Sequence, residues 1–212
     1  MKYLIFDVDG TLIDTKQMYM PAMIEALAEF GYHYDDETSA KYQRELFGIT
    51  GYDSLLRIGI DEAQIPQILK RWNELTIPRQ HLVTAFDQIP ETISKLATRD
   101  DIKLAIATSK TTPEITDFKG QFTWSGHFNV IVGADDTKEH KPNPEPLLTA
   151  LHRLDPNADV ADAYYIGDTN HDLEAAHNAG MHFAGALYGS AMPEKLATAE
   201  VKLTTPNDLL QL

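Results

Sequence analysis

The chain has 212 residues, 43% of them hydrophobic and 24% charged, which is typical of a globular protein. Its 32 acidic residues outnumber 18 lysines and arginines, and the net charge of -14 disfavours nucleic acid as a partner because polyanions are recognised by cationic side chains. The absence of cysteine excludes a thiol nucleophile, a thiolate metal site and a disulfide framework. No window approaches the roughly 18 apolar residues of a membrane span, so we expect a cytoplasmic protein without membrane contact.

The first predicted strand, residues 3–6, leads directly into two carboxylates. Side chains alternate along a strand, so Asp7 and Asp9 are expected on the same side, and Gly10 ends the strand. Like charges this close repel, so the pair needs a cation between them or a retained proton. A solvated turn is the alternative interpretation, because Asp and Gly are common turn residues.

A helical block and an alternating region follow. Residues from about 15 to 79 carry apolar side chains at helical spacing. Beyond residue 89, helical segments alternate with short apolar strands, which are predicted over 103–108, 130–133, 163–167 and 182–187.

This alternation predicts an α/β fold, a Rossmann-like parallel sheet with helices on both faces, because parallel strands need crossover helices. The helical block is then an insertion after the first strand. We predict a discontinuous core, residues 1–14 and 82–212, and an inserted all-helical domain, residues 15–81.

Polar side chains follow four of the predicted strands, and ligands of such sheets bind outside the carboxyl ends of the strands. The set consists of Asp7, Asp9, Thr108, Ser109, Lys141, Asp168 and Asp172. Each residue alone is a weak signal, since a Thr or Lys after a strand is commonly a cap or a solvated side chain. Their joint occurrence in this order predicts a site.

The last two acids are four residues apart in GDTNHD. Thr169 or Asn170 can cap a helix whose first turn contains Asp172. A helix N-terminus favours an acid without any metal, so Asp172 is equally a dipole partner or a site residue. Asp168, at the strand end, is the stronger candidate for a metal ligand.

The predicted crowding of acids suits Mg²⁺, which binds a few carboxylates and leaves positions for water and a substrate phosphate. Lys141 would add a second positive charge. In SKTTPE, Thr112 is predicted as a cap and Pro113 as the first helical residue, and the free amides of such a helix start can hold phosphate oxygens. Together these groups favour phosphoryl transfer. His171 and His177 are interpreted as surface or partly buried side chains, since Mg²⁺ prefers oxygen ligands.

Four motifs resemble those of the haloacid dehalogenase-like superfamily, in the same order. They are DVDGT at 7–11, IATS at 106–109, Lys141 in KPNPEP, and GDTNHD at 167–172. The resemblance spans nearly the whole chain, and the pattern is similar to the phosphoglycolate phosphatase and beta-phosphoglucomutase group, with the helical block as its cap.

The resemblance implies roles for these residues. Asp7 would be the nucleophile that forms an aspartyl phosphate, and Asp9 would protonate the leaving oxygen and then activate water. Mg²⁺ would be held by Asp7, the backbone carbonyl of Asp9, and Asp168, with Asp172 helping directly or through water. Thr108 and Lys141 complete the catalytic set. The residues expected to bind substrate are Gly10, Thr11, Thr108, Ser109, Lys141, Tyr19 and Gly51.

The predicted cap would select the substrate. Its loop FGITGYDS, at 47–54, looks like one that faces the active site in similar proteins, with an ordinary turn as the equal alternative. Tyr19 and Met20 stand where sugar-phosphate mutases carry a His, and Gly51 where they carry an Arg. We therefore favour hydrolysis of a small phosphorylated metabolite, with phosphoglycolate as the leading candidate, over the mutase reaction.

Three competing functions stay open on the residues alone. Pyrophosphate hydrolysis is chemically equivalent at such a site. A dehalogenase needs no metal and would leave Asp9, Asp168 and Asp172 without a purpose. A phospho-Asp signalling module would carry its Asp after a middle strand of a domain of about 120 residues, without a helical insertion. The sequence does not distinguish a monomer from a homodimer.

Overall fold

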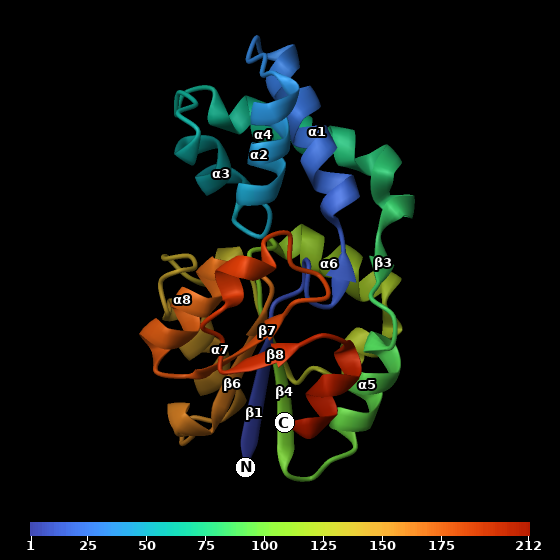
Figure 1. The fold of residues 1–212 in the computed structure, drawn as a ribbon, viewed down its shortest axis with the longest axis vertical. Helices are drawn as coiled ribbons and strands as arrows, with labels where there is room; N and C mark the ends of the chain where they lie inside the picture. Colours follow the sequence, from blue (N-terminus) through green and yellow to red (C-terminus); the bar gives the residue numbers. More distant parts are fainter.

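The computed structural model describes all 212 residues and contains a central six-stranded sheet (Figure 1). The strand order is β5-β4-β1-β6-β7-β8, and every neighbouring pair is parallel. The strands are β1 (Lys2–Phe6), β4 (Ile102–Ala107), β5 (Val130–Val132), β6 (Ala163–Gly167), β7 (His182–Ala186) and β8 (Val201–Leu203). The edge strand β8 was not predicted, because Lys202 interrupts its apolar residues, whereas β5, of the same length, is a continuous apolar run.

Helices cover both faces of the sheet, as the fold class predicted. Leu4 and Phe6 of β1 share a buried cluster with α5 (Ile89–Ala97) and α6 (Thr112–Gln121). Tyr3 and Ile5 point to the opposite face, where they pack with α7 (Glu145–Leu154) and α8 (Asn170–Ala179). The alternation of strand side chains thus divides the core into two layers.

A second group of helices, which we call the helical unit (residues 16–82), lies beyond the carboxyl ends of the strands (Figure 1). It comprises α1 (Lys16–Glu29), α2 (Asp36–Glu45), α3 (Gly51–Arg57), α4 (Ile65–Thr76) and the 3₁₀ helix η1 (Ile77–Leu82). These helices bury a cluster of their own, because α4 places Ile65, Ile68, Trp72 and Leu75 on one face.

The chain enters and leaves the helical unit through a two-stranded antiparallel ribbon, β2 (Ile13–Asp14) and β3 (Thr84–Ala85). The ribbon lies within a few residues of the predicted boundaries at 14/15 and 81/82. The division into two domains stays a prediction. Short 3₁₀ helices complete the fold: η2 (Thr123–His127), η3 (Ala134–Asp136), η4 (Val160–Asp162), η5 (Pro193–Leu196) and η6 (Pro206–Gln211). None of the helices has the length and apolar character that crossing a membrane requires.

The start of α6 differs from the prediction by one residue. Thr111, not Thr112, is the N-cap, and both its backbone N–H and its hydroxyl donate to Glu114 Oε2, at 2.8 and 2.6 Å. The reason is the spacing of a capping box, in which the acid stands three residues after the cap.

Candidate active site

The ends of three adjacent strands bring the predicted site residues together. Asp7 follows β1, Thr108 follows β4 and Asp168 follows β6, and β1 lies between the other two strands in the sheet. The side chains of Lys141 and Asp172 reach the same place from the loop before α7 and from the first turn of α8. All five residues are buried.

Asp7, Asp168 and Asp172 form a compact acidic group, because one carboxylate oxygen of each lies within 4.8 Å of the others. Burial, opposed by Lys141 but aided by Asp172 and Asp9, raises the pKa of Asp7 to about 7. Burial and the neighbouring carboxylates of Asp172 and Asp7 raise the pKa of Asp168 well above its usual range. The protein surroundings therefore do not fully stabilise the ionised forms of Asp7 and Asp168.

The lysine at the centre of this group is Lys141. Its Nζ donates to Asp172 Oδ1 at 2.7 Å and to the Tyr165 hydroxyl at 3.0 Å, and it lies 3.0 Å from Asp7 Oδ2. Burial works to lower the pKa of Lys141, but Asp172 and Asp7 raise it well above the usual value. Lys141 is therefore a permanent cation in this place.

Asp172 differs from the other two acids because both of its oxygens have partners. Oδ1 accepts from Lys141, while Oδ2 accepts from the backbone N–H and the hydroxyl of Thr169, at 3.0 and 2.6 Å. Burial opposes ionisation, yet Lys141 and the Thr169 hydrogen bonds hold the pKa of Asp172 below its usual value. Thr169 is thus the N-cap of α8, one of the two predicted caps, and Asp172 is the acid of its capping box.

Two oxygens of the acidic group, Asp7 Oδ1 and Asp168 Oδ2, are buried without a hydrogen-bond partner. Buried polar atoms are seldom left unpartnered, and an unpartnered pair of carboxylate oxygens is the donor set that a hard divalent cation prefers. The residues present therefore fit Mg²⁺. Asp9 offers no side-chain oxygen to this acidic group.

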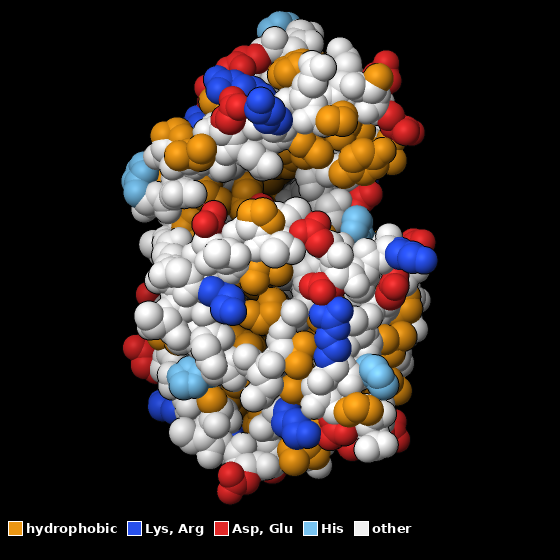
Figure 2. Space-filling view, turned by 180° about the vertical axis from the view of Figure 1, so that it is seen from behind, with side chains coloured by type: hydrophobic (Ala, Val, Ile, Leu, Met, Phe, Trp, Pro, Cys, Tyr) orange, Lys and Arg blue, Asp and Glu red, His pale blue; other side chains and the backbone are white.

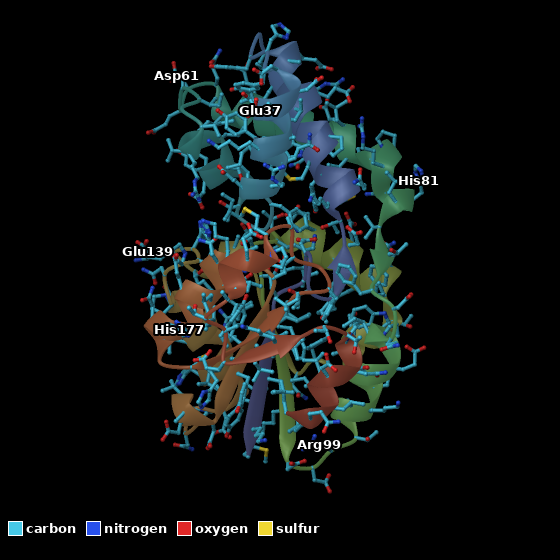
Figure 3. All side chains as sticks on the ribbon, in the orientation of Figure 1. Glu37, Asp61, His81, Arg99, Glu139 and His177 are labelled. Carbon is cyan, nitrogen blue, oxygen red and sulfur yellow. The ribbon has the colours of Figure 1, made fainter.

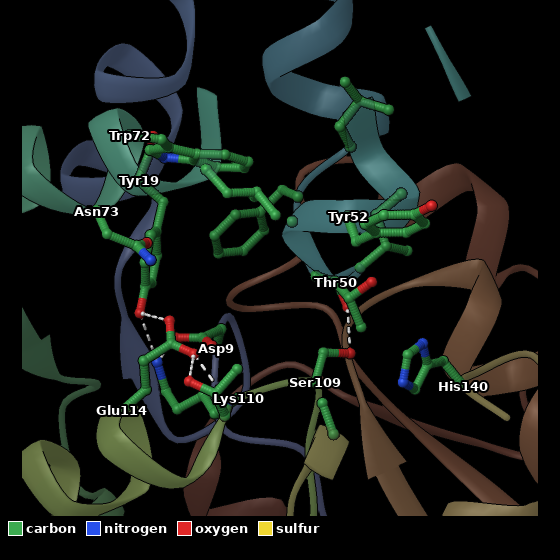
Figure 4. A pocket seen from close by; sticks show the side chains of 18 of the residues that line it. Asp9, Tyr19, Thr50, Tyr52, Trp72, Asn73, Ser109, Lys110, Glu114 and His140 are labelled. Atoms are coloured by element: carbon green, nitrogen blue, oxygen red, sulfur yellow. Dashed lines mark hydrogen bonds and ion pairs between the residues drawn. The ribbon is translucent and has the colours of Figure 1, made fainter. Parts of the chain in front are cut away.

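Asp9 has a hydrogen-bond network of its own, separate from the acidic group (Figure 4). Its Oδ1 lies 2.9 Å from Nζ of Lys110 and accepts from the Thr15 hydroxyl at 2.6 Å. Lys110 Nζ also donates to the Tyr19 hydroxyl, which donates to Glu114 Oε1 at 2.7 Å. A salt-bridged, hydrogen-bonded chain thus joins Asp9 to α1 and α6.

This network shows partners for Asp7 and Asp9 that the sequence analysis did not include. Each acid has its own buried lysine, Lys141 for Asp7 and Lys110 for Asp9, in addition to the cation or retained proton that the sequence suggested. Sequence reasoning missed Lys110. Its position directly after IATS was a signal, yet a lysine after a strand is ordinarily solvated.

Gly10 and Thr11 support Asp168. Gly10 has φ +74°, and a Cβ there would lie 2.2 Å from Asp168 Oδ2, so only glycine leaves room for that carboxylate. The Thr11 hydroxyl donates to Asp168 Oδ1 at 3.2 Å. Gly10 and Thr11, which were both predicted to bind substrate, therefore lie directly beside the Asp168 carboxylate.

The loop at 47–54 meets the strand ends. The Ser109 hydroxyl donates to the carbonyl of Gly48 at 3.2 Å, and Gly51 lines a cavity of about 290 Å³ together with Tyr19, Ser109 and Asp9. The Lys110 backbone N–H donates to Thr108 Oγ1 at 3.3 Å.

His177 does not belong to the site. It points away on the outer side of α8, where its Nε2 lies 3.2 Å from Glu200 Oε1 (Figure 3).

A family model described as haloacid dehalogenase-like hydrolase matches residues 4–186. The chain belongs to this family. The match confirms the resemblance predicted from the four motifs, and with it the prediction that the chain is an enzyme, a hydrolase.

Relatives and solved structures agree with this assignment. "Probable phosphatase IndB" of Dickeya dadantii is 30% identical over 204 residues, which cover 93% of this chain and 86% of that protein. Pyrophosphatase PpaX of Bacillus velezensis is 27% identical over 216 residues, covering 99% of this chain and 94% of that protein. A structure from Lactobacillus plantarum named "putative phosphoglycolate phosphatase" is 25% identical, with a TM-score of 0.85 over 100% of this chain and 99% of that one.

Proposed function

We propose that this hydrolase is a Mg²⁺-dependent phosphatase that cleaves a small phosphomonoester through an aspartyl phosphate on Asp7. The observation that carries the proposal is the pair of buried, unpartnered oxygens on Asp7 and Asp168 beside the ammonium group of Lys141. A buried carboxylate whose charge is partly neutralised by a lysine is suited to attack phosphorus.

In the proposed first step, an Asp7 oxygen forms a bond to phosphorus while the ester oxygen leaves and takes a proton from Asp9. In the second step, Asp9 takes a proton from water, the water oxygen bonds to phosphorus, and the acyl phosphate bond breaks. Thr15 and Lys110 would hold the Asp9 side chain in one orientation, since both contact its Oδ1.

Lys141 would keep the nucleophile in place through its 3.0 Å contact with Asp7. The transferred phosphoryl group would be positioned by Gly10, Thr11, Thr108, Ser109 and Lys141. Positioning and fixed charge are the main means by which proteins accelerate phosphoryl transfer.

Asp7 and Asp168 would hold Mg²⁺, with the backbone carbonyl of Asp9 as a further oxygen. Asp172 would help through water, because Lys141 and Thr169 already occupy its two oxygens. When bound, the cation would supply the positive charge that lets an anionic substrate approach the acidic group of Asp7, Asp168 and Asp172.

We further propose that residues 15–81 act as a cap over this site in a cytoplasmic enzyme. The resemblance and the name of one similar structure suggest phosphoglycolate as substrate, and the names of several relatives suggest pyrophosphate. A mutase reaction is less favoured. Tyr19 is engaged by Glu114 and Lys110, and Gly51 has no side chain with which to hold a sugar phosphate.

The proposal is tested by phosphate release from small phosphomonoesters and pyrophosphate, with Mg²⁺, in parallel with Asp7→Asn. Release by the wild type but not by the variant is expected. Equal release by both proteins would overturn the assignment of the nucleophile, and no release from any compound would overturn the phosphatase.

A further inference from the structure

The cavity beside Asp9 lies between the helical unit and the strand ends (Figure 4). Asp9, Ser109 and Lys110 line it from the sheet side, and the loop after α2 lines it from the helical unit. Given the proposed function, on which this inference rests, Asp9 protonates the leaving oxygen. The leaving group of the substrate therefore occupies this cavity, and the cavity lining determines its chemistry.

The helical unit contributes no charged side chain to the cavity. Its wall is formed mainly by apolar and aromatic groups, among them Phe47, Ile49, Leu69 and Trp72. The arginines of the neighbouring segments lie elsewhere. Arg57 Nη1 contacts His171 Nε2 at 2.8 Å, and Arg44 lines a separate, smaller cavity beside Asp168.

The hollow between the helical unit and the sheet is visible from outside. Figure 2 shows hydrophobic side chains gathered along the helical unit above this hollow. Tyr52 of α3 lines the cavity and is 42% exposed, while Asn73 of α4 adds an amide that can hydrogen-bond to an uncharged polar group.

The sheet side of the cavity carries more negative than positive charge. Three acids line it: Asp9, Glu114 and Asp135. The two basic side chains of this wall are already paired. Lys110 Nζ lies 2.9 Å from Asp9 Oδ1, and His140 Nδ1 lies 3.0 Å from Asp53 Oδ2. An anionic leaving group would lose hydration here without gaining a free cation, which is costly.

We propose that the substrate is a phosphomonoester whose leaving group is uncharged and presents an apolar or aromatic body to Phe47, Ile49, Leu69 and Trp72. Phosphoglycolate and pyrophosphate each carry a second anionic group and match this lining poorly. Burial of apolar surface contributes about 0.8 kcal/mol per methylene group, equivalent to roughly a threefold to fourfold gain per methylene.

The first experiment measures kcat/KM with Mg²⁺ for ethyl to pentyl phosphate, 2-phenylethyl phosphate, glycerol phosphate, phosphoglycolate and pyrophosphate. We expect a rise of about threefold per added methylene until the cavity is filled, and a preference of about tenfold or more for 2-phenylethyl phosphate over phosphoglycolate. A flat alkyl series, or a preference for phosphoglycolate or pyrophosphate, would overturn the inference and leave the phosphatase intact.

A charge placed on the cavity wall gives a matched test. Asn73→Lys should raise the ratio of kcat/KM for phosphoglycolate to kcat/KM for glycerol phosphate by about fivefold to tenfold. Gln67→Lys adds the same charge to an exposed position of α4 outside the cavity and should leave this ratio unchanged. Equal effects of the two variants would show that the cavity does not hold the leaving group.

Calorimetric binding to Asp7→Asn separates the two proposals, because this variant retains the cavity and should not turn over. Tighter binding of 2-phenylethyl phosphate than of phosphoglycolate, together with turnover by the wild type, supports both. Tighter binding without turnover of any ester would overturn the phosphatase. Tighter binding of phosphoglycolate would overturn the inferred leaving group.

Discussion

Lys141 and Asp7 form a buried ion pair, with Nζ 3.0 Å from Oδ2 and each side chain 2% exposed. The lysine also pairs with Asp172 at 2.7 Å, so one ammonium group serves two carboxylates from different parts of the chain. Its bonds leave Asp7 Oδ1 without a partner. The pair thus holds the proposed nucleophile while keeping one of its oxygens available.

Removing the lysine should therefore affect both stability and activity. Lys141→Met leaves two buried carboxylates without their cation, and we expect the free energy of unfolding to fall by about 3–5 kcal/mol and activity to be lost. Lys103→Met is the control, because Lys103 pairs with Asp155 at the surface, where its side chain is 36% exposed. Denaturant unfolding of both variants measures the contrast. Equal losses would contradict a central role for Lys141.

Lys110 should act through Asp9. Lys110→Met removes the 2.9 Å contact that holds the Asp9 carboxylate, so we expect kcat to fall by about 10- to 100-fold with a smaller change in KM. Lys119→Met, at an exposed position of α6, should leave both constants unchanged. The measurement is steady-state kinetics with a phosphomonoester that the wild-type enzyme hydrolyses. A change confined to KM would mean that Lys110 binds substrate rather than positioning Asp9.

The glycine of the first motif should be irreplaceable for steric reasons. In Gly10→Ala, the new Cβ would meet Asp168 Oδ2 at 2.2 Å, so we expect at least about a hundredfold loss of activity. Gly31→Ala is matched in backbone conformation, with φ +89°, but no atom lies within 4 Å of its Cβ. This control should lose about 1 kcal/mol of stability and retain activity. An active Gly10→Ala enzyme would show that Asp168 can move without consequence.

Removal of divalent cations should abolish turnover reversibly. A chelator is expected to lower the rate at least about a hundredfold, and added Mg²⁺ should restore it. Mg²⁺ at about 100 times its Kd should also stabilise the folded chain by about 2.7 kcal/mol. Asp168→Asn should raise the Mg²⁺ concentration needed for half-maximal rate by about tenfold or more. Full activity in the chelator would contradict the metal site and favour dehalogenase-like chemistry.

The sequence predicted the sheet, its helical insertion and the meeting of the strand-end residues, because the order of strands and helices restricts the topology. It did not predict how the charges are paired. Lys110 cannot be told from a solvated lysine without knowing that Asp9 lies 2.9 Å away. The sequence analysis placed the cap of α6 one residue late, at Thr112, although the three-residue spacing from Thr111 to Glu114 already indicated a capping box.

Asp172 illustrates the same limit. The sequence left it equally a dipole partner of the helix or a site residue, and the structure adds the partners of its two oxygens. Those partners, Lys141 and Thr169, come from different segments of the chain. Packing therefore decides what local spacing leaves open.

The covalent intermediate on Asp7 can be observed directly. Borohydride added during turnover with Mg²⁺ reduces an acyl phosphate to an alcohol, which converts the modified aspartate to homoserine, and peptide mass spectrometry locates the change. We expect homoserine at position 7 only, and only when substrate and Mg²⁺ are both present. Phosphate release without any reduction at Asp7, or with reduction at another aspartate, would contradict the account.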